Sequence, residues 1–280
     1  MGEHQAIEGL PWGQHEPPWW ARFLVAVSRN TPLGRGTPRK WLYSVFTRLH
    51  DGPVDYDLWG LRVRLHPAQN LTERKMLMRP DHVDRAEHAL LREALRAPGS
   101  VFLDIGANAG LYSLDAALHA GPGSTIVAIE PDPALLSRLA FNLRQAEAAG
   151  RIGTGVRVVP LAVAVGDRDG EAVLSTAGDE GSRSLLGAGA GRAVRLRSLA
   201  GIVAEQGLAR VDVLKIDVEG YEDKVLPPFF RTAPVALRPR LVIIEHLSRA
   251  RWSEDCIAQC LSLGYRQRGT TRNNTFLELA

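Results

Sequence analysis

The stretch that decides the fold is "SVFLDIGANAGLYSLD", residues 100–115. Its beginning, SVFLDIG, is an apolar run typical of a buried strand, and residues 109–120, AGLYSLDAALHA, read as the helix that follows. Gly106 and Gly110 stand in the turn between them and allow a ligand to approach the backbone closely. Such turns commonly hold the phosphates of a dinucleotide. Here, however, Asp104 places a carboxylate at the end of the strand.

From residue 100 onward the sequence alternates between strand and helix, which favours a parallel sheet. STIVAIE (124–130) is expected as the second strand, and the next helix is expected to have Asp132 as its cap. VRVVPLAV (156–163) is expected as the third strand. Pro160 has no N–H to donate to a neighbouring strand, so this strand is predicted at an edge of the sheet.

The remaining segments continue the α/β pattern. Residues 166–199 read as a turn, a strand, a loop rich in Gly and Ser, and a second strand. VDVLKIDV (211–218) and RLVIIEHL (240–247) are apolar strands of the buried kind. A helix over 253–264 is expected with Ser253 as its cap. The chain closes as an antiparallel hairpin over residues 265–280.

The first 53 residues are expected to form an N-terminal leader, partly disordered, with one or two short helices over 18–50 that are broken at TPLGRGTP. Residues 54–280 are expected to form a Rossmann-like domain. It would begin with a hairpin over 54–67 that turns at Trp59-Gly60, and a helix over 79–99.

Composition limits the classes of function. With 45% hydrophobic and 23% charged residues, the chain belongs to the soluble globular class. The net charge of +3 suggests nucleic acid only weakly, because no run of basic residues interleaved with aromatics is present. Neither a signal peptide nor an integral membrane segment is recognised, which predicts a cytoplasmic protein. The apolar stretch WWARFLVAV (19–27) can lie on a membrane surface, pack on its own domain, or join two copies into a homodimer through the leader.

The carboxylate of Asp104 at the turn helps to distinguish between two classes of cofactor. A dinucleotide site needs the spacing G-x-G-x-x-G, whereas this turn reads G-A-N-A-G, and Asp104 would repel two phosphates. S-adenosylmethionine carries a sulfonium and an ammonium and no phosphate, so a carboxylate beside the turn is favourable. Glu130 is placed to accept hydrogen bonds from both ribose hydroxyls. Two plainer readings stay open, in which Asp104 only orients the loop and Glu130 is a solvated acid.

Five segments, FLDIGANAGLYS, VAIEPDP, LAVAVGDRDGEAVL, VDVLKIDVEGYEDKVL and LVIIEH, resemble, in that order, the FkbM family of S-adenosylmethionine-dependent methyltransferases. KIDVEGYE is the most specific of the shared motifs. The resemblance implies a Rossmann-like class I sheet of seven strands in the order 3-2-1-4-5-7-6, with the last strand antiparallel. The cofactor-binding residues that it implies, with the border of the adenine included, are Asp104, Gly106, Ala107, Asn108, Gly110, Glu130, Pro131, Asp132, Ala162, Val163 and Asp217.

The chain departs from the family pattern in three places. Ser198 stands where the family often has Asp, and His246 is not part of the pattern. The shared motifs do not cover residues 1–78.

A hydroxyl acceptor needs a base within hydrogen-bond reach. The candidate catalytic residues are His246, Glu219 and Asp217, which follow the fourth and fifth strands of the sheet. His246 is preferred as the base because its ordinary pKa is nearest to working pH. The alternatives are that His246 only packs or caps, and that Glu219 only stabilises the turn before Gly220.

Three further roles are weighed around the same strand ends. Asp217, Glu219 and Glu245 could together hold a divalent cation, but their spacing matches no recognised motif, and we predict no metal. Lys215 is expected to pair with one of these acids. His82 and Glu87 are considered as residues that close over the cofactor.

The sequence thus predicts an S-adenosylmethionine-dependent methyltransferase of secondary metabolism. The expected reaction is O-methylation of a small-molecule acceptor, which by resemblance is of the polyketide, sugar or glycolipid type. The alternatives are an RNA-directed or N-directed methyltransferase, a nicotinamide-dependent oxidoreductase, and a binding module that keeps the fold without turnover.

Overall fold

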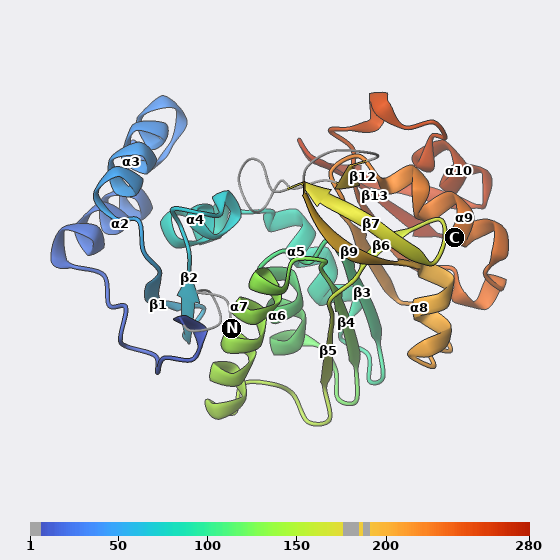
Figure 1. The fold of residues 1–280 in the computed structure, drawn as a ribbon, viewed down its shortest axis with the longest axis horizontal. Coiled ribbons are helices and arrows are strands. Elements are labelled where there is room, and N and C mark those ends of the chain that lie inside the picture. Colours follow the sequence, from blue (N-terminus) through green and yellow to red (C-terminus); the bar gives the residue numbers. More distant parts are fainter. Residues whose placement is uncertain (1–6, 176–184, 187–190) are drawn as a thin grey trace. The chain divides into compact units, whose positions relative to one another are not determined.

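The structure, a computed structural model, describes residues 7–175, 185–186 and 191–280. The described residues fall into two compact units (Figure 1). Unit 1 contains the residues up to Arg85 together with Ser137–Arg151. Unit 2 contains Ala86–Leu136 and the described residues from Ile152 onward. The hairpin expected at the start of the Rossmann-like domain therefore belongs to unit 1, and the predicted boundary at residue 53 stays a prediction.

Unit 1 begins with two helices, α2 (Trp19–Asn30) and α3 (Gly36–Leu49). A short 3-10 helix, Pro32–Gly34, separates them at the predicted break. Strands β1 (Val54–Leu58) and β2 (Leu61–Leu65) then pair antiparallel, as expected for this hairpin. Trp59 and Gly60 both have positive φ, at 57° and 72°, which is the backbone that a two-residue hairpin turn requires.

Helix α4 (Leu71–Met78) follows in unit 1 and was not predicted. Its start is fixed by Asn70, whose side chain accepts hydrogen bonds from the N–H groups of Thr72 and Glu73. Glu73 is fully buried and forms an ion pair at 2.7 Å with Arg138, which lies in helix α7 (Pro133–Ala148). The helix has only eight residues, three of them charged, so its hydrophobic pattern was too weak to predict it.

The single helix predicted over 79–99 is wrong. The segment contains a 3-10 helix, Pro80–His82, and then α5 (Arg85–Ala94). Asp84, between the two, has a φ of 43°, and this left-handed conformation ends the first element before the second begins.

Unit 2 is built on a seven-stranded sheet, whose order is β12-β13-β11-β10-β3-β4-β5. The strands are β3 (Val101–Ile105), β4 (Thr125–Ile129), β5 (Arg157–Leu161), β10 (Val213–Ile216), β11 (Leu241–Glu245), β12 (Tyr265–Thr270) and β13 (Asn274–Leu279). Numbered along the chain, this is 3-2-1-4-5-7-6, the order that the family resemblance implies. Strand β13 is antiparallel to both its neighbours, and β5 with Pro160 lies at the edge, as predicted.

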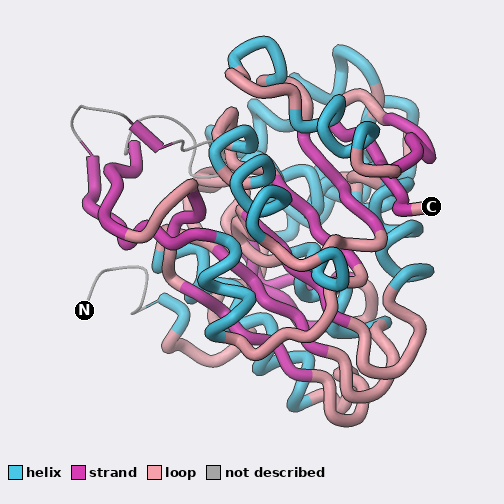
Figure 2. Tube along the Cα trace, turned by 90° about the vertical axis from the view of Figure 1, so that its right-hand side faces the viewer, coloured by secondary structure: helices cyan, strands magenta, loops and turns pink. Residues whose placement is uncertain are grey.

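Helices lie on both sides of this sheet, whose strands are magenta in Figure 2. On one face, alternate residues such as Leu103 and Leu214 belong to a core shared with α8 (Leu199–Glu205), α9 (Leu226–Thr232) and α10 (Cys256–Ser262). The intervening residues point to the other face, where Asp104 meets Ser113 of α6 (Leu111–His119). The site residues are thus positioned by the period-two alternation of the strands.

A second sheet of unit 2 has the order β6-β9-β7-β8. Its strands are β6 (Ala164–Gly166), β7 (Gly170–Ser175), β8 (Leu185–Leu186) and β9 (Gly191–Ser198). Strands β7 and β9 correspond to the two strands predicted over 166–199. The loop predicted between them lies mostly outside the described residues.

Helix caps test the sequence reasoning locally. Asp132 caps α7 as predicted, since its Oδ1 accepts from the N–H of Ala134 at 3.0 Å. Ser253 does not cap α10: the helix begins at Cys256 and Asp255 accepts from its first-turn N–H groups. Ser198, the departure from the family pattern, caps α8 by accepting from the N–H of Gly201. Within the described part of the chain, no helix combines the length and the apolar character needed to cross a bilayer.

Candidate functional site

The predicted site residues gather where the parallel strands of unit 2 reach their carboxyl ends. The N–H groups of Gly106 and Ala107 both donate to the carbonyl of Ile129, the last residue of β4, at 3.0 Å. The N–H of Asp217 donates to the carbonyl of Ile105, the last residue of β3, also at 3.0 Å. The loops after β3, β4 and β10 are therefore held against one another by the backbone.

The glycine turn after β3 is shaped by left-handed residues. Gly106, Asn108 and Gly110 have φ values of 74°, 55° and 75°. A Cβ added at Gly106 would lie 1.9 Å from the carbonyl oxygen of Asp217, so no other residue fits there. This glycine is needed for the contact between two backbones, whatever ligand the turn holds.

Glu130 organises the turn after β4. Its Oε2 accepts from the N–H of Asn108 and its Oε1 from the N–H of Asp132, each at 3.0 Å. Glu130 is 8% exposed, which contradicts the reading as a solvated acid. Burial raises the pKa of its carboxyl to about 7, although the two backbone N–H groups oppose the shift. Each carboxyl oxygen keeps a second lone pair for a ligand.

Asp104 is fully buried in β3. Its Oδ2 accepts from the hydroxyl of Ser113 at 2.7 Å, whereas its Oδ1 accepts no hydrogen bond from the described residues. Burial raises the pKa of this carboxyl, and the ammonium group of Lys215 acts in the opposite direction. Asp104 is thus tied to the first turn of α6 and has one oxygen to spare.

Lys215 lies between two of the acids. Its Nζ is 3.8 Å from Oδ1 of Asp104 and 3.8 Å from Oδ2 of Asp217. The same ammonium group lies 4.9 Å from the ring centroid of Tyr112, a favourable cation–π distance. The prediction that Lys215 pairs with one of these acids is confirmed.

Two glutamates near Asp217 have unusual titration. Burial, together with the nearby negative charge of Asp217, raises the pKa of Glu219 to about 7. Burial also raises the pKa of Glu245 to about 7. Oε2 of Glu245 is buried and accepts no hydrogen bond from any described residue. Perturbed carboxyls at the strand ends are typical of functional sites.

Sequence reasoning missed the role of Glu222, the last acid of KIDVEGYE. This fully buried carboxylate accepts from the N–H groups of Val218 and Gly220 and from Nε1 of Trp252, at 3.0, 3.3 and 2.8 Å. It therefore fixes the turn that carries Glu219, whose φ is 55°. The available signal was an acid in the motif beyond the strand, three residues after Glu219.

His246, the preferred base, follows β11. Its N–H donates to the carbonyl of Asn273, and its Nδ1 lies 2.9 Å from Oγ1 of Thr275. Thr275 thus holds one ring nitrogen, which serves either a base or a packed residue. Whether His246, Glu219 and Asp217 act in catalysis stays a prediction.

The idea that His82 and Glu87 close over the cofactor stays a prediction. Glu87 accepts from Oγ1 of Thr271 and Nδ2 of Asn274, so it fastens the C-terminal hairpin of unit 2. His82 belongs to unit 1. As far as the described residues go, no three His, Cys, Asp or Glu side chains are grouped as a metal site requires, which leaves the cation at Asp217, Glu219 and Glu245 unsupported.

Comparison with known proteins identifies a protein family whose sequence model matches this chain. The model of the methyltransferase FkbM domain matches residues 104–266. The 31-O-demethyl-FK506 methyltransferase FkbM of Streptomyces tacrolimicus is 31% identical over 183 residues, 56% of this chain and 69% of that protein. The AMB antimetabolite synthetase AmbE of Pseudomonas aeruginosa is 36% identical over 162 residues, 46% of this chain. The match spans only 8% of the length of AmbE.

Among solved structures, an O-methyltransferase from Bacillus cereus in complex with SAH is 14% identical, with a TM-score of 0.40. The similarity covers 70% of this chain and 82% of that one. A TM-score this low says nothing about the chemistry of this chain.

Proposed function

Because the chain belongs to the FkbM methyltransferase family, we propose that it transfers a methyl group from S-adenosylmethionine to a hydroxyl of a small-molecule metabolite. The observation that carries the proposal is the charge at the strand ends. Asp104, Glu130 and Asp217 surround the glycine turn, and Lys215 is the cation that lies among them. Such a site suits a cationic ligand and disfavours the two phosphates of a dinucleotide.

The residues present fit this cofactor. Glu130 has a free lone pair on each oxygen for the two ribose hydroxyls, and one oxygen of Asp104 accepts no hydrogen bond from the described residues. Gly106 and Gly110 leave the turn without side chains where the ligand must approach the backbone. Pro131, Asp132, Ala162 and Val163 would border the adenine.

The cofactor, when bound, supplies a methyl group made electrophilic by its sulfonium. What the chain must add is alignment of the acceptor and removal of its proton. His246 is our first choice as the base, with one ring nitrogen held by Thr275. Glu219, whose pKa burial raises to about 7, is the second choice. Asp217 would help to position the acceptor.

The name of one relative supports the choice of acceptor class. The name of the Streptomyces protein describes methylation of an oxygen of FK506, a small molecule. We propose an acceptor of the polyketide, sugar or glycolipid type for this chain. A cytoplasmic location, a homodimer through the leader and the lack of a nucleic-acid partner stay predictions.

Calorimetric titration with S-adenosylhomocysteine and then with NADH tests the cofactor. We expect micromolar binding of S-adenosylhomocysteine alone, weakened at least about tenfold in Asp104→Asn and Glu130→Gln, since each removes a charge-assisted contact. Asp167→Asn, on an exposed turn of unit 2, is the matched control and should bind like the unchanged protein. Binding of NADH, or of neither ligand, would overturn the proposal.

A further inference from the structure

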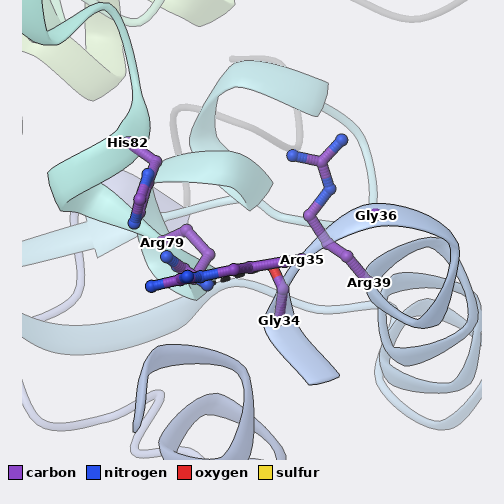
Figure 3. A pocket seen from close by; sticks show the side chains of 6 residues that line it. All are labelled: Gly34, Arg35, Gly36, Arg39, Arg79 and His82. Carbon is purple, nitrogen blue, oxygen red and sulfur yellow. Dashed lines mark hydrogen bonds between the residues drawn. The ribbon is translucent and has the colours of Figure 1, made fainter. Parts of the chain in front are cut away.

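Unit 1 contains a cavity that the proposed function does not use. It has a volume of about 310 Å³ and is lined by Gly34, Arg35, Gly36, Arg39, Arg79 and His82 (Figure 3). No acidic side chain is part of this lining. Arg35, Arg39 and Arg79 form no ion pair with any carboxylate in the part of the chain that the structure describes. The cavity is therefore cationic, and no described carboxylate pairs with its arginines.

Arg79, immediately after α4, is the buried arginine of the cavity, and backbone hydrogen bonds hold it in place. It is 7% exposed, and its Nη1 donates to the carbonyls of Ser28 and Gly34, at 3.3 and 3.1 Å. A Cβ at Gly34 would lie 1.8 Å from the carbonyl oxygen of Ser28 and 2.8 Å from Nη1 of Arg79. Glycine at this position therefore allows two carbonyls to fix the guanidinium group. Carbonyls orient the group without cancelling its charge, so Arg79 stays available to an anion.

The N-terminus of α3 adds to the positive potential. Arg35 occupies the N-cap position, but its side chain makes no capping hydrogen bond, and Gly36 lines the cavity. The first turn of this 14-residue helix contributes the N–H groups of Gly36 and Thr37, since Pro38 has none, and the positive end of the helix dipole. Arg39, in the same first turn, has a buried Nε without a hydrogen-bond partner among the described residues. Its guanidinium carbon lies 5.8 Å from the ring centroid of Tyr43.

The direction of the pKa shift of His82 is consistent with a positive electrostatic potential in this cavity. In Figure 3 its ring points toward the guanidinium groups of Arg79 and Arg35. Burial lowers the pKa of His82, and Arg79 and Arg35 lower it further, against the opposing charge of Asp81. The arginines thus outweigh the one acid beside the histidine.

We propose that this cavity binds the phosphate group of a phosphomonoester. A phosphate dianion offers several oxygens to planar guanidinium groups and to helix N–H groups, which a singly charged carboxylate does not match. The volume suits a phosphate with a small organic group attached. The phosphate can come from a soluble ester or from a lipid headgroup. The site lies within unit 1 and does not depend on methyl transfer.

The test uses the full chain and three probes. Inorganic phosphate and glycerol 3-phosphate are titrated by calorimetry, and phosphatidylcholine vesicles with and without phosphatidic acid are used in flotation. We expect saturable binding of at least one phosphate probe, weakened at least tenfold in the double variant Arg35→Gln/Arg39→Gln. Arg35 is exposed, Arg39 is partly exposed, and neither forms an ion pair with a described residue, so this variant is expected to fold.

Lys40→Gln/Arg48→Gln is the matched control, because it removes two exposed charges from the same helix outside the lining. It should change binding less than twofold. Binding of the soluble probes assigns a soluble ester, and binding of phosphatidic acid vesicles alone assigns a lipid phosphate. The proposal is overturned if no phosphate probe binds saturably, if the arginine variant binds unchanged, or if the control loses as much.

Discussion

The ammonium group of Lys215 lies 3.8 Å from Oδ1 of Asp104, a carboxylate that the fold removes completely from solvent. The two residues are register partners on the neighbouring parallel strands β10 and β3. Oδ1 has no hydrogen-bond donor among the described residues, and Ser113 serves only Oδ2. The positive charge of Lys215 therefore offsets part of the free-energy cost of burying the charged carboxylate of Asp104 beside the glycine turn.

Removal of Lys215 should be costly. We expect Lys215→Met to lower the free energy of unfolding by about 3–5 kcal/mol, because a buried charge is left without its partner. Urea denaturation measures this difference. Lys40→Met is the control, because Lys40 is exposed on α3 and pairs with no carboxylate among the described residues, so its loss should change stability by at most about 0.5 kcal/mol. Equal losses in the two variants would show that Lys215 does not compensate Asp104.

Alanine substitutions at Gly106 and Gly99 distinguish the cost of a strained backbone conformation from the cost of a steric clash. Both have positive φ, at 74° and 69°, but a Cβ at Gly106 would meet the carbonyl oxygen of Asp217, whereas a Cβ at Gly99 meets nothing within 4 Å. We expect Gly99→Ala to cost about 1–2 kcal/mol. Gly106→Ala should cost more than about 3 kcal/mol or prevent folding. Thermal unfolding and soluble yield compare them, and similar stabilities would contradict the close approach of the two loops.

Glu245 is predicted to weaken the fold above neutral pH. Burial raises its pKa from 4.5 to about 7, so between these values the folded protein holds a proton that the unfolded chain has lost. Stability therefore falls as the pH rises from 4.5 through 7. Glu245→Gln keeps an acceptor for the N–H of Leu247 and removes the charge. It should raise the free energy of unfolding at pH 8 by about 1–2 kcal/mol.

The same variant should leave stability at pH 4 nearly unchanged, because this pH lies below both values and the carboxyl of the unaltered protein is then mostly protonated in the folded and the unfolded state. Urea titrations at the two pH values test this. A variant that is less stable at pH 8 than the parent would mean that Glu245 has a favourable partner. A gain in stability with a loss of activity would mark Glu245 as a residue kept for function.

The sheet was predictable because its signals are local. Apolar runs, the Asp132 cap and Pro160 each fix a strand, a helix start or an edge by their own chemistry. Helix α4 and the role of Glu222 were not predictable in this way. Both depend on buried carboxylates, Glu73 and Glu222, whose partners Arg138 and Trp252 are far along the chain.

The site was predictable as a set of strand ends, whereas its electrostatics were not. The motif KIDVEGYE indicates acidic residues after a strand. The burial that raises the pKa values of Glu130 and Glu245 arises only when the folded chain packs around them. The cationic cavity shows the same limit. Arg35 and Arg79 are 44 positions apart in the sequence but line one cavity, where Gly34 lets Arg79 approach the backbone closely.

The pH dependence of cofactor binding should identify Glu130. Burial raises its pKa to about 7, and only the carboxylate form can accept from both ribose hydroxyls while it also accepts from Asn108 and Asp132. The affinity for S-adenosylhomocysteine should therefore rise about tenfold between pH 6 and pH 8 and level off above. In Glu130→Gln this rise should disappear, with binding at pH 8 weaker by at least about tenfold. Asp167→Asn should keep the rise, and a Gln variant that kept it would assign the titration to another group.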